Sequence, residues 1–233
     1  MLKGIIFDMD GVIADSHPIH LKSWKILLSS AGVAATEKEL DIIRDGRSKE
    51  ELLRHFLGDL AHADLHTYAR EKDRLYRENA KELTPVKGIR PLLEELKSAG
   101  ITLGVASSGS YWRVNQTLDL LSLKDYFVVI STADEFKCGK SDPAIFRMTA
   151  QRMQVRCEQT LVFEDSATAI RSARSVCMKC LGIADSSRAE TLITAGAQHV
   201  VPNFVTLSLI QLQTLFSMRR AAKTSARALS CSN

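Results

Sequence analysis

Two aspartates, Asp8 and Asp10, stand one residue apart near the start of this 233-residue chain. The short apolar run at residues 4–7 predicts a buried strand that places both carboxylates at its carboxyl end, where open α/β sheets bind their ligands. Carboxylates this close repel each other, and the repulsion is relieved when a cation binds between them or when one keeps its proton. Either outcome serves catalysis. A plainer alternative is that the pair only caps a turn, helped by Gly11.

Further polar and charged groups follow later apolar runs or stand before later helices. They are Ser107 and Ser108, Lys140, and the acidic pair Glu164 and Asp165. Hydroxyls beside free N–H groups at a helix start suit a bound oxyanion, and carboxylates suit a cation. Each group by itself also reads as a helix cap or a solvated loop residue. Because the carboxyl ends of parallel strands meet at one edge of a sheet, we expect these groups to lie near Asp8 and Asp10.

The elements that position these groups change character along the chain. After the first strand, the spacing of apolar residues predicts only helices, over residues 17–31, 37–43, 49–57 and 63–83. From residue 85 onward, helices over residues 90–99, 113–121, 143–153, 167–176 and 207–218 alternate with strands over residues 101–106, 127–131, 160–163, 180–183 and 199–201. This alternation predicts an α/β fold with a doubly wound, mostly parallel sheet and right-handed crossovers.

The helical segment forms an insertion directly after the paired aspartates. We therefore divide the chain into a core domain of residues 1–15 and 83–218, an all-helical cap domain of residues 16–82, and a basic tail of residues 219–233 that we expect to be disordered. An insertion above the aspartates suits a lid that excludes water and selects the substrate.

The composition, with 45% hydrophobic and 25% charged residues, is that of an ordinary globular protein. No segment approaches the ~20 apolar residues of a membrane span. The N-terminal apolar run is broken by Asp8, Asp10 and Asp15 too early for a signal peptide. We therefore predict a cytoplasmic, monomeric protein that binds no membrane.

The five cysteines show no framework spacing, which suits a reducing compartment. Cys177 and Cys180 form a C-x-x-C, but no second pair completes a zinc site and no thioredoxin-like pattern accompanies it. We interpret both as ordinary small core residues.

The formal net charge of +4 is concentrated at the end of the chain. The four basic residues of segment 219–227 account for all of it, and that segment contains no acid. A short basic tail is most simply a solvated end, so we predict no nucleic-acid partner.

In chain order, the strand ends supply acid, acid, hydroxyl, lysine and acid. This order resembles the motifs of the haloacid dehalogenase (HAD) superfamily of phosphotransferases, which are met here by Asp8 with Asp10, Ser107, Lys140, and Glu164 with Asp165. The resemblance reaches to about residue 218 and implies a Rossmann-like core. Within the superfamily, the chain resembles the branch with a helical cap, which contains β-phosphoglucomutases and sugar-phosphate phosphatases.

The resemblance implies a role for each catalytic group. Asp8 would attack phosphorus in line and form an aspartyl-phosphate. Asp10 would give a proton to the leaving oxygen and then take one from the acceptor, a role suited to a carboxyl whose pKa its neighbours raise. Ser107 and Lys140 would bind the phosphoryl oxygens. Because relatives that cleave carbon–halogen or carbon–phosphorus bonds lack an acid at the position of Asp10, dehalogenase and phosphonatase activities are not expected.

The resemblance also implies a magnesium ion as cofactor. Asp8 and Asp165 would hold Mg²⁺ through carboxylate oxygens and Asp10 through its backbone carbonyl, with Glu164 nearby and waters completing the shell.

Residues of the cap, and one in the loop after the second motif, are the candidates for substrate binding. They are Ser16, His20, Gly46, Arg47, Ser48, Lys49, Lys72 and Ser108. His20 also has a plainer interpretation as a satisfied polar residue. Trp24 is better interpreted as a core residue of the first cap helix than as a substrate contact.

Two departures from the mutases favour hydrolysis over phosphoryl transfer within a sugar. The mutases carry arginine where this chain has Lys49, and lysine cannot make the same bidentate contact. They also carry a polar, basic run where this chain has residues 109–112, although Arg113 can compensate. We therefore predict a phosphatase of small phosphorylated sugars or related metabolites, with a β-phosphoglucomutase-like activity as the alternative and a non-catalytic phosphometabolite-binding protein as a remote one.

Overall fold

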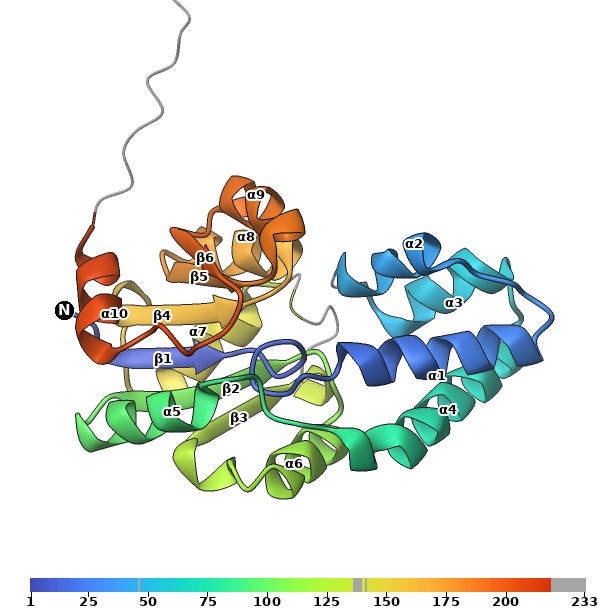
Figure 1. Cartoon of the computed structure of the whole chain (residues 1–233), viewed down its shortest axis with the longest axis horizontal. Helices are drawn as coiled ribbons and strands as arrows, with labels where there is room; N and C mark the ends of the chain where they lie inside the picture. The colour runs from blue at the N-terminus through green and yellow to red at the C-terminus, as the bar shows by residue number, and fades with distance from the viewer. Residues whose placement is uncertain (46, 136–139, 141, 219–233) are drawn as a thin grey trace, which may run out of the picture.

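The computed structural model describes residues 1–45, 47–135, 140 and 142–218. Within them, six parallel strands form one sheet in the order β3-β2-β1-β4-β5-β6 (Figure 1). The strands are β1 (Gly4–Phe7), β2 (Thr102–Ser107), β3 (Val129–Thr132), β4 (Thr160–Glu164), β5 (Lys179–Ile183) and β6 (His199–Val201). Phe7 at the end of β1 is in register with Val105 of β2 and Phe163 of β4. The carboxyl ends of these three central strands therefore meet at one edge.

Helices cover both faces of the sheet. One face packs against α5 (Ile89–Ser98), α6 (Tyr111–Leu120) and α10 (Leu209–Ser217), and the other against α7 (Ala144–Arg152), α8 (Ala167–Ser175) and α9 (Ser186–Ala195). Residues of β1 alternate between the two cores, since Ile5 and Phe7 face the first and Ile6 the second. The predicted doubly wound α/β fold is confirmed.

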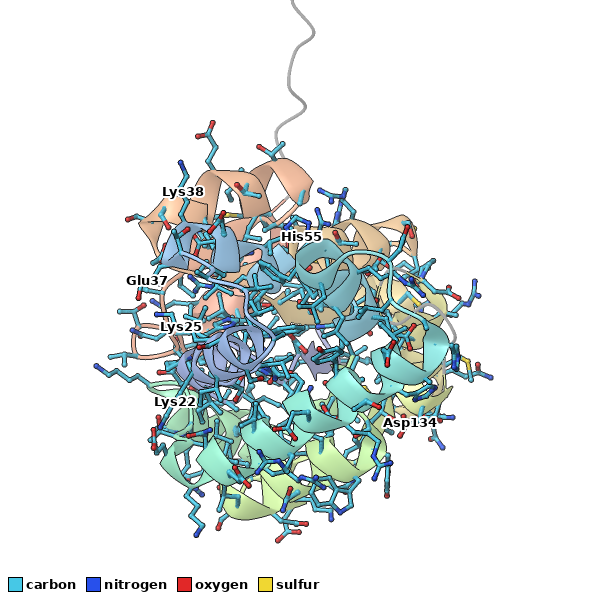
Figure 2. The ribbon with its side chains drawn as sticks, turned by 90° about the vertical axis from the view of Figure 1, so that its right-hand side faces the viewer. Lys22, Lys25, Glu37, Lys38, His55 and Asp134 are labelled. Atoms are coloured by element: carbon cyan, nitrogen blue, oxygen red, sulfur yellow. The ribbon has the colours of Figure 1, made fainter. Side chains whose placement is uncertain are left out.

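The remaining helices lie together beyond the carboxyl end of β1 (Figure 1). They are α1 (His17–Ser30), α2 (Glu37–Leu40), α3 (Lys49–Leu57) and α4 (His62–Asn79), with 3₁₀ turns at Asp41–Asp45 and Ala80–Glu82. This helical group has its own apolar cluster, in which Trp24 is 2% exposed and packs with Leu27 and Leu53. The interpretation of Trp24 as a core residue is confirmed. On the outside, Lys25 pairs with Glu37 at 2.8 Å (Figure 2).

Two chain segments connect the helical group to the sheet, and they run side by side. Ala14 forms an antiparallel bridge with Pro85, and the Asp15 backbone N–H donates to the Thr84 carbonyl at 2.8 Å. The chain thus leaves and re-enters the sheet at one place, next to the boundary predicted at residues 15 and 83. The division into core and cap domains remains a prediction.

Helix α9 is missing from the sequence-based expectation. Its first half, Ser186 to Glu190, is polar, and only Leu192 and Ala195 are buried, so the helical spacing of apolar residues is weak. The N-cap is the available signal, because the Asp185 side chain accepts from the Ser187 backbone N–H. Elsewhere the helices and strands agree with the expected ones to within a few residues.

Three further sequence-based expectations concern single residues and the tail. Cys157, Cys177 and Cys180 are free thiols in the part of the chain that the structure describes. Cys180 is buried as expected, but the interpretation of Cys177 as a core residue is wrong, because it is exposed in the turn between α8 and β5. The predicted tail, residues 219–233, lies outside the described residues. None of the described helices is long and apolar enough to cross a membrane.

We expect Leu27→Ala to lower the free energy of unfolding by about 2–5 kcal/mol, because Leu27 is fully buried in the helical group. The neighbouring residue Ile26 is 42% exposed, so Ile26→Ala should change it by only about 0.5 kcal/mol. Urea unfolding followed by circular dichroism measures both values. Equal effects of the two substitutions would contradict the packing described for α1.

Candidate active site

Three buried carboxylates meet at the carboxyl ends of β1 and β4. Asp8, Glu164 and Asp165 are 4%, 0% and 5% exposed, and one oxygen of each lies within 4.8 Å of the others. The Lys140 ammonium lies between two of them, at 2.6 Å from Asp8 Oδ1 and 2.9 Å from Glu164 Oε2. The Met9 and Ser166 backbone N–H groups donate to Asp8 and Glu164, respectively. The structure thus brings together four of the predicted catalytic and metal-binding residues.

The carboxylates of this cluster hold more negative charge than the lysine balances. Burial raises the pKa of Asp8 to about 6, with further increases from Asp165 and Asp10, although Lys140 opposes them. Burial and the Asp8 charge raise the pKa of Glu164 well above its usual range. A buried set of three carboxylates and one ammonium is relieved by protonation or by a cation.

The donor set of this cluster fits a hard divalent cation. Its members are oxygen ligands at the spacing of a single ion, and magnesium and calcium prefer such ligands to nitrogen or sulfur. The excess negative charge fits the same kind of ion. Asp8, Glu164 and Asp165 could therefore hold a metal.

Asp10 belongs to a second group, which joins the sheet to the helical group. Its Oδ1 accepts from Ser16 Oγ at 2.7 Å and lies 3.3 Å from His20 Nε2. Arg113 of α6 donates from Nη1 to Oδ1 at 3.0 Å and from Nη2 to Oδ2 at 2.8 Å. Although burial alone would raise the pKa of Asp10, Arg113 and His20 hold it well below its usual range. The raised pKa expected of Asp10 is therefore wrong for this arrangement, because the bidentate pair with Arg113 favours the ionised carboxylate.

The same group continues into α1 and α4 through a buried lysine. Lys72 is 3% exposed, and its Nζ lies 3.3 Å from His20 Nδ1, 5.2 Å from the Tyr76 ring centroid and 5.7 Å from that of Trp24. Burial, together with the charge of Arg113, lowers the pKa of Lys72 to about 7. Burial and the charge of Lys72 lower the pKa of His20 to about 4.

The loop after β2 has the geometry of a helix start. Ser107 is fully buried, and its Oγ accepts from the Gly109 backbone N–H at 3.1 Å, while Ser110 caps α6 by accepting from the Arg113 N–H. Ser108, predicted to bind substrate, is exposed and makes no hydrogen bond with a described residue. The end of β2 and the hydrogen bond from Gly109 therefore hold Ser107 in place, and its binding of phosphoryl oxygens stays a prediction.

Three other predicted substrate contacts, Arg47, Ser48 and Lys49, are described, and they lie apart from the two groups. Ser48 is the N-cap of α3 in a capping box with Glu51, and Lys49 pairs with Asp73 at 2.6 Å. Arg47 is exposed. Within the described residues, none of the three contacts the Asp8 or the Asp10 group. Gly46 lies outside the described residues.

Two basic side chains beside Asp165 were not anticipated from the sequence. His17 Nε2 lies 2.8 Å from Asp165 Oδ2, and Gly11, with φ +75°, leaves the space because a Cβ there would clash with both side chains. Arg188 Nη1 lies 4.0 Å from the same oxygen, while its Nη2 donates to the Arg44 carbonyl. His17 was detectable from its place in the first turn after Asp15, but Arg188 lies on the helix that the apolar pattern misses.

Comparison with known proteins finds relatives that cover most of this chain. A family model described as haloacid dehalogenase-like hydrolase matches residues 5–183. A phosphorylated carbohydrates phosphatase of Thermotoga maritima is 32% identical over 214 residues, which are 86% of this chain and 94% of the relative. The fructose-1-phosphate phosphatase YqaB of Escherichia coli is 32% identical over 186 residues, 77% of this chain and 95% of the relative.

A solved structure with the same fold is that of β-phosphoglucomutase from Clostridium difficile. It superimposes with a TM-score of 0.82 at 27% identity, over 93% of this chain and 97% of that one. Fold, site and comparisons define an enzyme of phosphatase or phosphomutase type. The chain belongs to the haloacid dehalogenase-like hydrolase family.

At pH 6, we expect the free energy of unfolding of Lys72→Met to exceed that of the wild type by roughly 1–3 kcal/mol. This difference between the two proteins should become smaller between pH 7 and 10. Folded Lys72 loses its proton near pH 7, whereas the unfolded lysine keeps it to about pH 10.4, so the stability contributed by this residue rises with pH over that interval. Urea unfolding of both proteins from pH 6 to 10 measures the gap.

The matched control is Lys22→Met, because the Lys22 side chain is 47% exposed and pairs with Glu82 on the surface. This variant should follow the wild-type curve across the whole pH range. A pH-independent difference for Lys72→Met would show that Lys72 is not held in a poorly solvated site.

Proposed function

We propose that this protein is a magnesium-dependent phosphatase that hydrolyses small phosphorylated sugars or related metabolites through an aspartyl-phosphate. The observation that carries the proposal is the buried cluster of Asp8, Lys140, Glu164 and Asp165 beside Asp10, at the end of the central strand. Two relatives at 32% identity, named for phosphatases of phosphorylated carbohydrates and fructose 1-phosphate, support the substrate class.

In the proposed first step, the Asp8 carboxylate attacks phosphorus and the bond to the leaving oxygen breaks. Asp10 has to take up a proton before this step, because Arg113 and His20 hold its pKa well below its usual range. It then gives that proton to the leaving oxygen, and the aspartyl-phosphate remains on Asp8. Lys140 lies 2.6 Å from Asp8 and would offset the charge of the phosphoryl oxygens, with Ser107 as a further donor. In the second step, Asp10 takes a proton from water, whose oxygen attacks phosphorus and releases phosphate from Asp8.

We assign the metal site to Asp8, Glu164 and Asp165, with the backbone carbonyl of Asp10. Bound there, Mg²⁺ would neutralise the repulsion between the attacking carboxylate and the phosphoryl group. Lys140 would supply further positive charge to Asp8 and to the phosphoryl group.

The helical group, residues 16–82, is proposed to be the cap that closes over the site. Support comes from its attachment at one place, the Ala14–Pro85 bridge, and from the contacts of its helix α1 with Asp10. We propose that it contributes the substrate contacts Ser16, His20, Gly46, Arg47, Ser48, Lys49 and Lys72, with Ser108 from the core.

A second candidate function is phosphoryl transfer within a sugar phosphate, as in a β-phosphoglucomutase. The TM-score of 0.82 to the Clostridium difficile enzyme of that name favours it. The ion pair between Lys49 and Asp73 favours hydrolysis, since a distal phosphate would have to compete with Asp73 for this lysine.

We expect magnesium-dependent phosphate release from a panel of sugar phosphates, and a loss of at least ~10³-fold in kcat for Asp8→Asn, which removes the nucleophile. The matched control is Asp119→Asn, because Asp119 is 59% exposed in a surface pair with Lys124. Chelation with EDTA should stop the reaction and added Mg²⁺ should restore it. Turnover by Asp8→Asn at the wild-type rate would refute the aspartyl-phosphate.

One assay distinguishes hydrolysis of a sugar phosphate from transfer of its phosphoryl group to another position of the sugar. With β-glucose 1-phosphate and a catalytic amount of glucose 1,6-bisphosphate, we expect free phosphate to appear faster than glucose 6-phosphate. Coupled enzymatic detection of both products measures the ratio. The opposite order would establish the mutase function and overturn the phosphatase.

A further inference from the structure

The first turn of helix α1 is attached to the core through its polar side chains. Ser16, at the N-cap position, makes no side-chain hydrogen bond to the helix and donates instead from Oγ to Asp10. His17, the first residue of the helix, places Nε2 2.8 Å from Asp165 Oδ2. A missing side-chain cap destabilises a helix start. These two residues therefore serve the contact with the core rather than the helix itself.

The contact between His17 and Asp165 is enclosed. The two side chains are 18% and 8% exposed. The backbone at Gly11 passes beside them, and a Cβ there would clash with both. An ionised carboxylate can only accept a hydrogen bond, so the imidazole is the donor. A hydrogen bond to a charged group in such surroundings restricts the rotation of the carboxylate, and His17 thereby orients Asp165.

A second side chain connects the same carboxylate to the helical group. Arg188 of α9 places Nη1 4.0 Å from Asp165 Oδ2, and its Nη2 donates to the Arg44 carbonyl at 2.8 Å. Arg44 lies in the 3₁₀ turn of the helical group, residues 41–45. Asp165 is thus connected to the helical group at two points, directly at the start of α1 and through Arg188 at this turn.

Asp165 also belongs to the metal site, where it differs from the other two carboxylates. Asp8 and Glu164 contact Lys140 and backbone N–H groups, all of which belong to the core. Both basic partners of Asp165 address Oδ2, and a carboxylate that binds a metal through one oxygen has the other available for such partners. Partners of this kind orient a metal ligand and raise metal affinity.

We propose that His17 is a positioning residue of the metal site, which holds Asp165 in the orientation that a divalent cation requires. The helical group thereby contributes to metal affinity. Because coupling between two equilibria is reciprocal, a bound metal also stabilises the contact between α1 and the core. This inference rests on the proposed function, because it concerns the metal site of that reaction.

Binding of Mn²⁺ tests the proposal without substrate or turnover, because Mn²⁺ takes the same oxygen ligands as Mg²⁺ and is paramagnetic. The full chain is titrated with MnCl₂, and electron paramagnetic resonance measures the free ion. We expect His17→Ala to bind Mn²⁺ about 10- to 100-fold more weakly than the wild type, the usual effect of losing such a partner. His17→Gln should recover most of the affinity, since its amide N–H can donate to Asp165.

The control variant is His55→Ala, because His55 is exposed on α3 (Figure 2). It should bind Mn²⁺ as the wild type does, and melting temperatures show whether each variant is folded. Wild-type affinity in His17→Ala, or no binding by the wild type, would overturn the proposal. So would tighter binding by His17→Ala, which would show that His17 competes with the metal for Asp165. A loss that His17→Gln does not reduce would assign the effect to the packing of α1.

The reciprocal effect is measured by hydrogen exchange and mass spectrometry. Added Mg²⁺ should slow the exchange of peptides from residues 17–30 in the wild type and in His17→Gln. In His17→Ala this slowing should be lost. Exchange that does not respond to Mg²⁺ in the wild type would overturn the coupling between the metal site and α1.

Failure of this inference and failure of the proposed function give different results. Magnesium-dependent release of phosphate by a protein whose metal affinity does not depend on His17 refutes the positioning role and leaves the phosphatase. Metal affinity that depends on His17, in a protein that releases no phosphate from any substrate, retains the positioning role and refutes the phosphatase.

Discussion

The pairing of Lys140 with Asp8 and Glu164 is the interaction on which the site depends. Three buried carboxylates at the ends of two neighbouring strands would repel one another strongly without a cation. One ammonium at 2.6 and 2.9 Å from two of them offsets part of this repulsion. The part that remains is the physical reason for expecting a metal, and it also keeps the Asp8 carboxylate close to positive charge, where a phosphoryl group would arrive.

The sheet makes this arrangement possible because its strands are parallel and in register. Phe7 lies opposite Phe163, so the residues that follow them, Asp8 and Glu164, emerge next to each other. Packing behind them is tight, since the ring centroids of Phe7 and Phe163 are 5.1 Å apart and both side chains are fully buried. The apolar core thereby fixes the positions of the charged residues, which gain little freedom to move apart.

Asp10 differs from Asp8 although only one residue separates them. Residues two apart share a face only within a strand, but β1 ends at Phe7, and beyond it the Asp10 carboxylate contacts Ser16 and His20 of the helical group. It is thus surrounded by Ser16, His20 and Arg113 rather than by carboxylates. The two aspartates therefore have opposite pKa shifts, upward for Asp8 and downward for Asp10. These directions are the reverse of those that a nucleophile and an acid need, so the proposed reaction requires a cation beside Asp8 and the removal of Arg113 from Asp10.

The sequence alone was enough to predict the α/β alternation, the helical insertion and the order of the candidate catalytic groups. These follow from local patterns, since an apolar run or a helical spacing is visible within about ten residues. It did not determine α9, whose buried face is too small, or the contacts of Arg113, His17 and Arg188 with aspartates up to 148 positions away. It also left open that Ser48 is engaged as a helix cap and Lys49 as a partner of Asp73. Such contacts become visible in the folded chain alone. The partners of a charged side chain depend on which surfaces packing brings together, and a local sequence pattern does not indicate which surfaces those are.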